Sequence, residues 1–95
     1  MSTHVRDNPR HSRYELVVED QVVGVAAYRD TGEALVFSHT EIEPSMRGRG
    51  LGVILVQGAL DAVRREGRSV IPSCWYVDGF INQHPEYRDL LASET

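Results

Sequence analysis

Cysteine, positive charge and long apolar runs are all scarce in this 95-residue chain. Its one cysteine cannot form an internal disulfide, which suits a reducing compartment and predicts a cytoplasmic protein. No apolar run approaches the roughly 20 residues of a membrane-spanning helix. The polar, charged N-terminus is unlike a secretory signal. The sequence therefore favours a function that involves no membrane.

The charge balance argues against nucleic-acid binding. The formal net charge is −4 at pH 7, whereas binding to nucleic acid through phosphates needs a surplus of Lys and Arg. The four histidines show no metal-ligand spacing, so we expect no metal site. Apolar residues make up 41% of the chain, which is enough for a modest core in a single domain.

Glycine is concentrated in the segment 47–52, Arg-Gly-Arg-Gly-Leu-Gly, called the glycine loop below. It follows a strand-like run and precedes an apolar-periodic run from Val53 to Val63. Glycine permits positive φ and a close approach of the backbone to a ligand. A helix that begins here also offers unpaired N–H groups and a partial positive charge. The first hypothesis is therefore a ligand that contains phosphate.

Two common nucleotide-binding loops fit this segment poorly. A nucleotide-triphosphatase loop would continue with Gly-Lys-Ser/Thr, which is absent. A dinucleotide loop needs its third glycine one residue later and more chain after it. The pattern that fits is Arg-x-x-Gly-x-Gly, formed by Arg47, Gly50 and Gly52. It resembles the coenzyme A pyrophosphate loop of the GNAT acetyltransferase superfamily.

Neighbouring segments extend this resemblance over residues 14 to 91. They are His39-Thr40-Glu41-Ile42, Val70-Ile71-Pro72-Ser73-Cys74, Tyr76-Val77 and His84-Pro85-Glu86-Tyr87. Together they are similar to very small, stand-alone GNAT-like N-acetyltransferase domains. The resemblance implies an acyltransferase that uses acetyl-CoA and an unidentified amine acceptor, either a small molecule or a protein.

Hydrophobic periodicity predicts an α/β fold, which the resemblance makes a minimal GNAT fold. Residues 1–12 lack an apolar period and are expected to be a flexible arm before a single domain, 13–95. The expected mixed sheet combines an antiparallel three-strand meander with one parallel strand. The elements, in chain order, are strands near 14–18, 22–28 and 34–43, a long cofactor-binding helix from Leu51 to a stop at Gly67, a strand over 69–74 and a short C-terminal helix over 76–83.

Two residues carry specific structural expectations. Pro72 lacks an N–H, so the fourth strand should lose its pairing near its C-terminal end. The GNAT resemblance implies the same, because the pantetheine arm there occupies a gap between two splayed strands. An edge strand would accommodate Pro72 equally well. Gly58 costs the long helix about 1 kcal/mol relative to alanine, which a close crossing over a strand would explain.

The resemblance also implies a set of cofactor-binding residues. Backbone N–H groups of the glycine loop would hold the diphosphate, with added charge from Arg49 and cover from Val53. The alternative for Arg47 and Arg49 is a pair of solvated surface arginines. The implied set is Ile42, Arg47, Gly48, Arg49, Gly50, Leu51, Gly52 and Val53.

His39 and Glu41 are candidates for the acceptor side. Two-residue alternation places both on one face of the third strand, with Thr40 and Ile42 on the other. An amine must lose a proton before it attacks, and a histidine suits that task. Glu41 would orient His39 or act through water. A structural histidine within the sheet is the alternative.

Cys74 and Tyr76 complete the candidate catalytic set. Cys74 could accept the acetyl group first, activated by the following helix or by His39. An inert buried cysteine, or direct attack by the amine, is the alternative. The resemblance implies a tyrosine that protonates the departing thiolate, with Tyr76 and then Tyr87 as candidates. Trp75 is expected to pack or to act as a lid.

The chain departs from larger GNAT proteins on the acceptor side. Glu19-Asp20-Gln21 stands where those proteins have two helices between the first and second strands, and the extra C-terminal strands are absent. The acceptor pocket is therefore expected to be incomplete, and a homodimer, a partner protein or an exposed peptide substrate would complete it. A non-catalytic module that binds acetyl-CoA or a protein, or an interaction domain without cofactor, is the alternative.

Overall fold

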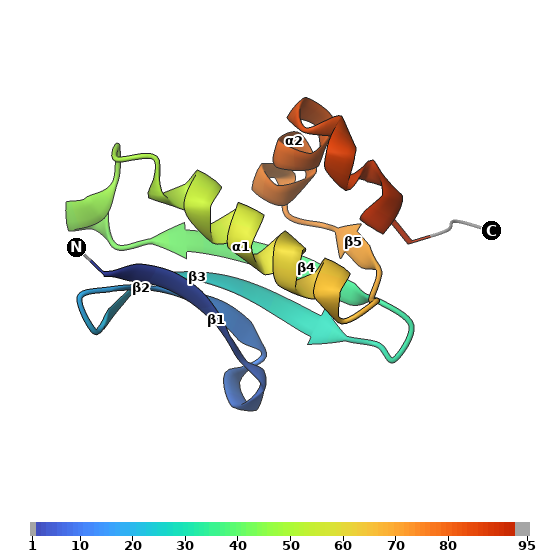
Figure 1. Cartoon of the computed structure of the whole chain (residues 1–95), viewed down its shortest axis with the longest axis horizontal. Helices are drawn as coiled ribbons and strands as arrows, with labels where there is room; N and C mark the ends of the chain where they lie inside the picture. The colour runs from blue at the N-terminus through green and yellow to red at the C-terminus, as the bar shows by residue number, and fades with distance from the viewer. Residues whose placement is uncertain (1, 93–95) are drawn as a thin grey trace.

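A five-stranded sheet with helices against one face forms the molecule, and the computed structural model describes residues 2–92 (Figure 1). The strands are β1 (Thr3–Asn8), β2 (Arg13–Val18), β3 (Gln21–Asp30), β4 (Leu35–Ile42) and β5 (Val70–Pro72). The α-helices are α1 (Leu51–Arg65) and α2 (Trp75–Gln83), and the 3-10 helices are η1 (Pro9–His11), η2 (Pro44–Met46) and η3 (Pro85–Leu90). No helix among the described residues is long and apolar enough to cross a membrane.

The strands lie in chain order, β1-β2-β3-β4-β5. The first four form an antiparallel meander, and β5 runs parallel to β4 because α1 makes the connection between them. Glu19 and Asp20 both have positive φ, which suits the two-residue turn between β2 and β3. The predicted α/β fold, with a mixed sheet, a long helix and a short C-terminal helix, is confirmed.

Strand β1 corrects one expectation. We expected residues 1–12 to be a flexible arm, but Thr3–Asn8 pairs with β2 along its whole length. The connection between the first and second strands is therefore η1. Glu19-Asp20-Gln21, which we expected to replace the two missing helices, instead joins the second strand to the third. The prediction was wrong because β1 contains a single apolar residue, Val5, and so has no hydrophobic period of its own.

Gly58 lies where α1 crosses β1. A Cβ at this position would come within 2.6 Å of a methyl carbon of Val5, closer than real Cβ atoms approach their neighbours. The expected close crossing over a strand is confirmed, and the strand is the one that sequence patterning missed. The contact packs the edge strand β1 against α1, the helix whose N-terminus lines the candidate site.

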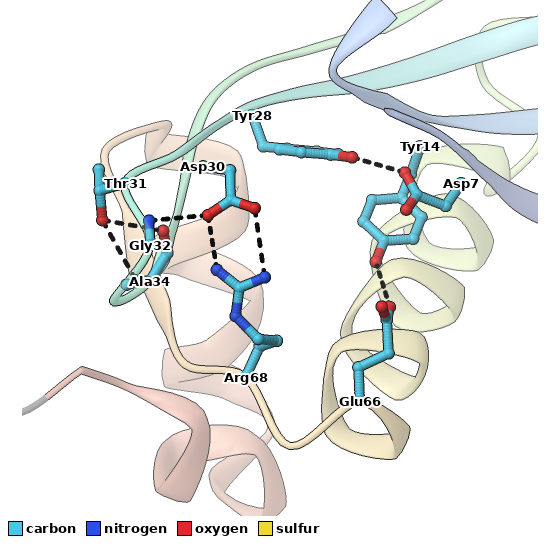
Figure 2. Close-up of polar contacts among 9 residues, drawn as sticks. All are labelled: Asp7, Tyr14, Tyr28, Asp30, Thr31, Gly32, Ala34, Glu66 and Arg68. Atoms are coloured by element: carbon cyan, nitrogen blue, oxygen red, sulfur yellow. Dashed lines mark hydrogen bonds and ion pairs between the residues drawn. The ribbon is translucent and has the colours of Figure 1, made fainter. Parts of the chain in front are cut away.

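Aromatic residues from three strands form the centre of the core. The rings of Tyr14, Tyr28 and Phe37 lie 5.5 to 6.1 Å apart, beneath the buried face of α1. Figure 2 shows how the two phenols are satisfied. Tyr28 donates to Asp7 of β1 at 2.7 Å, and Tyr14 donates to Glu66 at the end of α1. Burial raises the pKa of both phenols far above their usual value, so both remain donors.

A buried carboxylate joins β1 to β2 on the sheet face away from the helices. Glu15 is only 1% exposed, yet its oxygens accept bonds from Arg6 at 2.9 Å, Arg13 at 2.8 Å and Asn8 at 3.0 Å. Burial alone would raise the pKa of Glu15, but these three donors outweigh it and lower the pKa to about 2. Polar contacts therefore replace apolar pairing in attaching the edge strand.

We expect Glu15→Gln to lower the free energy of unfolding at pH 7 by about 2 kcal/mol, because three donors lose a charged acceptor. The folded-state pKa is depressed from 4.5, so the stabilisation is complete above pH 4.5 and is lost as the pH falls toward 2. Urea unfolding between pH 7 and pH 2 measures the free energy of unfolding of the wild type and the variant. Glu33→Gln is the control, because Glu33 is exposed in the turn between β3 and β4. A pH profile of Glu15→Gln that parallels the wild type would contradict the assignment.

Candidate functional site

A cleft of about 680 Å³ opens where β4 and β5 part. The two strands pair only from Leu35↔Val70 to Phe37↔Pro72, and β4 then continues to Ile42 without a strand on that side. The expected loss of pairing at Pro72 is confirmed. The edge of β4, the glycine loop and the first turn of α2 surround the space that results.

A bulge in β4 decides which side chains reach the cleft from the helix side. The register with β3 shifts between Ala27 and Tyr28, so that Ser38 is an extra residue in β4. Because side chains alternate along a strand, the bulge brings Thr40 to the same face as Phe37. His39 and Glu41 consequently lie on the opposite, open face of the sheet. They share one face, as the alternation along the strand predicted.

The glycine loop presents a row of free backbone donors. Gly48 and Gly50 have φ of 82° and 73°, and a Cβ at either position would meet no atom within 4 Å. Glycine is therefore required here by backbone conformation and not by crowding. The N–H groups of Gly48 and Gly50 donate to no other group within residues 2–92. Those of the first α1 residues lack an intrahelical acceptor, so the loop suits an anion.

Gly52 makes room for a neighbouring side chain. A Cβ here would lie 2.5 Å from the hydroxyl oxygen of Tyr76 and 3.0 Å from its ring. The missing side chain thus lets a residue of α2 reach the first turn of α1. Tyr76 closes one side of the cleft, with its hydroxyl beside the N-terminus of α1.

The two arginines of the loop have different surroundings. Arg47 lines the cleft, and its Nε donates to the carbonyl of Ile42 at 3.2 Å, which ties the loop to the end of β4. Arg49 is exposed and does not line the cleft, and neither does Val53. The side chain of Val53 instead borders a smaller hollow against α2.

Cys74 sits at the inner end of the cleft. It follows β5 by two residues and immediately precedes α2, and its N–H donates to the carbonyl of Phe37 at 2.8 Å. The side chain is 8% exposed, with Sγ 3.5 Å from the hydroxyl oxygen of Thr40. Burial alone would raise the pKa of the Cys74 thiol. Hydrogen bonds outweigh this effect and leave the pKa below its usual value; they come from the hydroxyl and the N–H of Thr40 and from the N–H groups of Tyr76 and Val77 in the first turn of α2.

His39 is separated from the thiol by the strand itself. Its Nε2 lies 3.4 Å from a carboxylate oxygen of Glu41, and both side chains are more than half exposed. We expected either the following helix or His39 to activate Cys74. The structure places the start of α2 at the sulfur, as the first alternative predicted, and has Thr40 there in place of His39, because neighbouring residues of a strand point to opposite faces.

The cleft brings together most of the predicted site residues. Those that line it are His39, Glu41, Ile42, Arg47, Gly48, Gly50, Leu51, Gly52, Cys74 and Tyr76. Lining residues that sequence reasoning did not assign to a site are Ser38, Thr40, Met46, Ser73 and Trp75. Thr40 is the chemically important one, and only the bulge in β4 could have revealed it. Residues 2–92 hold no group of three or more potential metal-binding side chains.

Known proteins match both the sequence and the fold. The family model for GCN5-related N-acetyl-transferase matches residues 13–90. Protein NATD1 of Bos taurus is 36% identical over 62 residues, which cover 64% of this chain and 55% of that protein. Protein NATD1 of Danio rerio is 35% identical over 70 residues, covering 70% and 64%. The chain thus spans less than two thirds of these relatives.

A solved structure shares the architecture. The NMR structure of a GCN5-like protein from Staphylococcus aureus superposes with a TM-score of 0.69, covering 97% of this chain and 90% of that one. The two sequences are 16% identical, so this likeness concerns the fold alone.

The contact between Thr40 and Cys74 gives a prediction for thiol chemistry. Thr40→Val removes the hydroxyl and should move the pH midpoint of Cys74 alkylation by iodoacetamide to higher pH, because the thiolate loses a hydrogen bond. Thr40→Ser keeps the hydroxyl and should titrate close to the wild type. A Thr40→Val midpoint equal to that of the wild type would show that the hydroxyl does not stabilise the thiolate.

Proposed function

Because this chain belongs to the GCN5-related N-acetyltransferase family, we propose that it binds acetyl-CoA in the cleft beside β4 and transfers the acetyl group to an amine. The observation that supports this most directly is the row of free N–H groups in the glycine loop, at one end of a cleft whose other end is Cys74. A diphosphate needs such donors, and a thioester needs an open path to the reacting groups.

The residues around the cleft fit the successive parts of this substrate. The N–H groups of 48–52 suit the diphosphate, and the first turn of α1 has no acidic residue to repel it. Residues 38–42 of β4 have no strand on the cleft side, so their backbone groups suit the amides of the pantetheine arm. Acetyl-CoA supplies an activated acyl group as its thioester.

The acceptor amine must arrive uncharged at the acyl carbon. In this proposal His39 takes the proton from the incoming ammonium, directly or through water, with Glu41 at 3.4 Å to orient the imidazole. Both residues belong to the lining of the cleft, while their side chains are exposed on the open face of the sheet, where an amine can reach them from solvent. The exposed approach suits an amine on a flexible segment.

Cys74 offers a two-step route. Its thiolate sulfur attacks the carbonyl carbon, a new carbon–sulfur bond forms, and the coenzyme thiolate leaves with a proton from Tyr76. The amine nitrogen then attacks the carbonyl carbon of acetyl-Cys74, the carbon–sulfur bond breaks to restore the thiolate, and the proton that the nitrogen loses returns to Tyr76 directly or through water. The lowered pKa of Cys74 and its place at the helix N-terminus favour this route over direct attack.

The acceptor side of the site is only partly enclosed. Only η1 connects β1 to β2, and His39 and Glu41 remain 64% and 58% exposed. A second protomer or a protein substrate would supply the missing surface, and we place the reaction in the cytoplasm. The same exposure favours one other candidate, a module that holds acetyl-CoA without turnover.

Binding of the cofactor tests the proposal. We expect calorimetry to show micromolar acetyl-CoA binding that Gly50→Glu abolishes, because a carboxylate enters the diphosphate site. Gly32→Glu is the matched control: Gly32 also has positive φ and open space around it, but lies in the turn before β4. Absence of binding by folded wild type, or equal loss in both variants, would contradict the assigned site.

The two chemical routes differ in a covalent product. Incubation with acetyl-CoA should leave one acetyl group on Cys74, detected by mass spectrometry, and Cys74→Ala should lose most turnover. His39→Ala should depress turnover far more than cofactor binding if His39 is the base. Full activity of Cys74→Ala without any adduct would establish direct attack, and loss of binding and turnover together in His39→Ala would make that residue structural.

A further inference from the structure

Trp75 is the only tryptophan of the chain, and it is 82% exposed at the start of α2. We expected it to pack or to act as a lid, but the structure shows it packed against little besides the edge of Tyr76, with ring centroids 6.0 Å apart. Exposure of so large an aromatic side chain beside a cleft is typical of a binding surface, because tryptophan is usually largely buried.

A second hollow lies beside this residue. It has a volume of about 180 Å³ and runs along α2 from its first turn to its C-terminal end, with the first turn of α1 at its border. Its lining residues are Val53, Trp75, Tyr76, Gly79, Phe80, Gln83 and His84. Trp75 and Tyr76 also line the main cleft, so the two spaces adjoin across these side chains.

The chemistry of the hollow suits a flat heterocycle. Gly79 leaves its floor open, since a Cβ there would meet no atom within 4 Å, and Val53 adds a 41% exposed apolar wall. The His84 ring is held in place, stacked on Phe80 at 4.1 Å with Nδ1 2.8 Å from the Phe80 carbonyl oxygen. Together with the Gln83 amide, it provides polar groups beside apolar and aromatic faces.

The geometry points to this hollow as the site of the adenine ring of coenzyme A, stacked on Trp75. The inference rests on the proposed function, in which the diphosphate lies at residues 48–52. Val53 is the next residue along the chain and borders the hollow, so the adenosine end of the molecule is adjacent to it. The pantetheine end then points the other way, toward Cys74.

With adenine on Trp75, the site would recognise the molecule that carries the acyl group as well as the acyl group itself. An acyl group on coenzyme A has an adenosine to place on Trp75, whereas the same group on phosphopantetheine does not. Base–aromatic stacking corresponds to roughly 5- to 150-fold in affinity. The site would therefore select acyl groups on free coenzyme A over those on a phosphopantetheine-bearing carrier protein.

Trp75 itself supplies the readout, because no other tryptophan contributes to the fluorescence. Coenzyme A should quench the wild-type emission, while 4′-phosphopantetheine should not. By calorimetry, Trp75→Ala should weaken coenzyme A binding about tenfold and leave phosphopantetheine binding unchanged, and Trp75→Phe should retain most of the difference. Gly79→Leu fills the hollow and should reproduce the selective loss.

Ile71→Ala is the matched control, since Ile71 is also an exposed apolar residue but lines neither space. If Trp75→Ala weakens both ligands equally, or if coenzyme A binds without quenching Trp75, the adenine assignment is wrong while the cofactor site stands. If neither ligand binds the folded wild type, the proposed function fails together with it.

Discussion

The parting of β4 from β5 is the constraint on which the candidate site depends. Pairing with β4 ends at Pro72, and the chain leaves the sheet immediately after it. The bond from the Leu35 N–H to the Ser69 carbonyl shows that residues 69 and 71 face β4, so the nitrogen of Pro72 lies on the outer side of this edge strand. The remaining length of β4 then has an unpaired edge, and α2 begins beside that edge and not beyond the sheet. Without this early parting, a continued β5 would fill the space that the cleft occupies.

Three small local features convert that gap into a chemically specific space. Glycines at positive φ leave backbone donors free at one end, and Gly52 admits Tyr76 at the side. The bulge at Ser38 turns Thr40 toward Cys74 at the other end. All three features are needed for an anion site and a thiol of lowered pKa to lie in one cleft.

Sequence reasoning located what local chemistry determines and missed what depends on pairing. The early end of the fourth strand at Pro72 and the close crossing at Gly58 were both predicted, and the glycine loop was located by its composition alone. Because β5 is an edge strand, Pro72 is accommodated for the second of the two reasons that the sequence offered. Strand β1 was missed, because its attachment relies on Glu15 and its partners and not on an apolar period. The contact between Thr40 and Cys74 was missed because a bulge has no signature in this sequence.

We propose that free N–H groups of residues 48–52 and the open edge of β4 hold acetyl-CoA. The most direct test is an amide NMR titration of the ¹⁵N-labelled protein with acetyl-CoA. We expect the largest shift changes at Gly48, Arg49 and Gly50, with a second group along residues 38–42. Saturable changes confined to the open sheet face, or no changes in the glycine loop, would contradict the account.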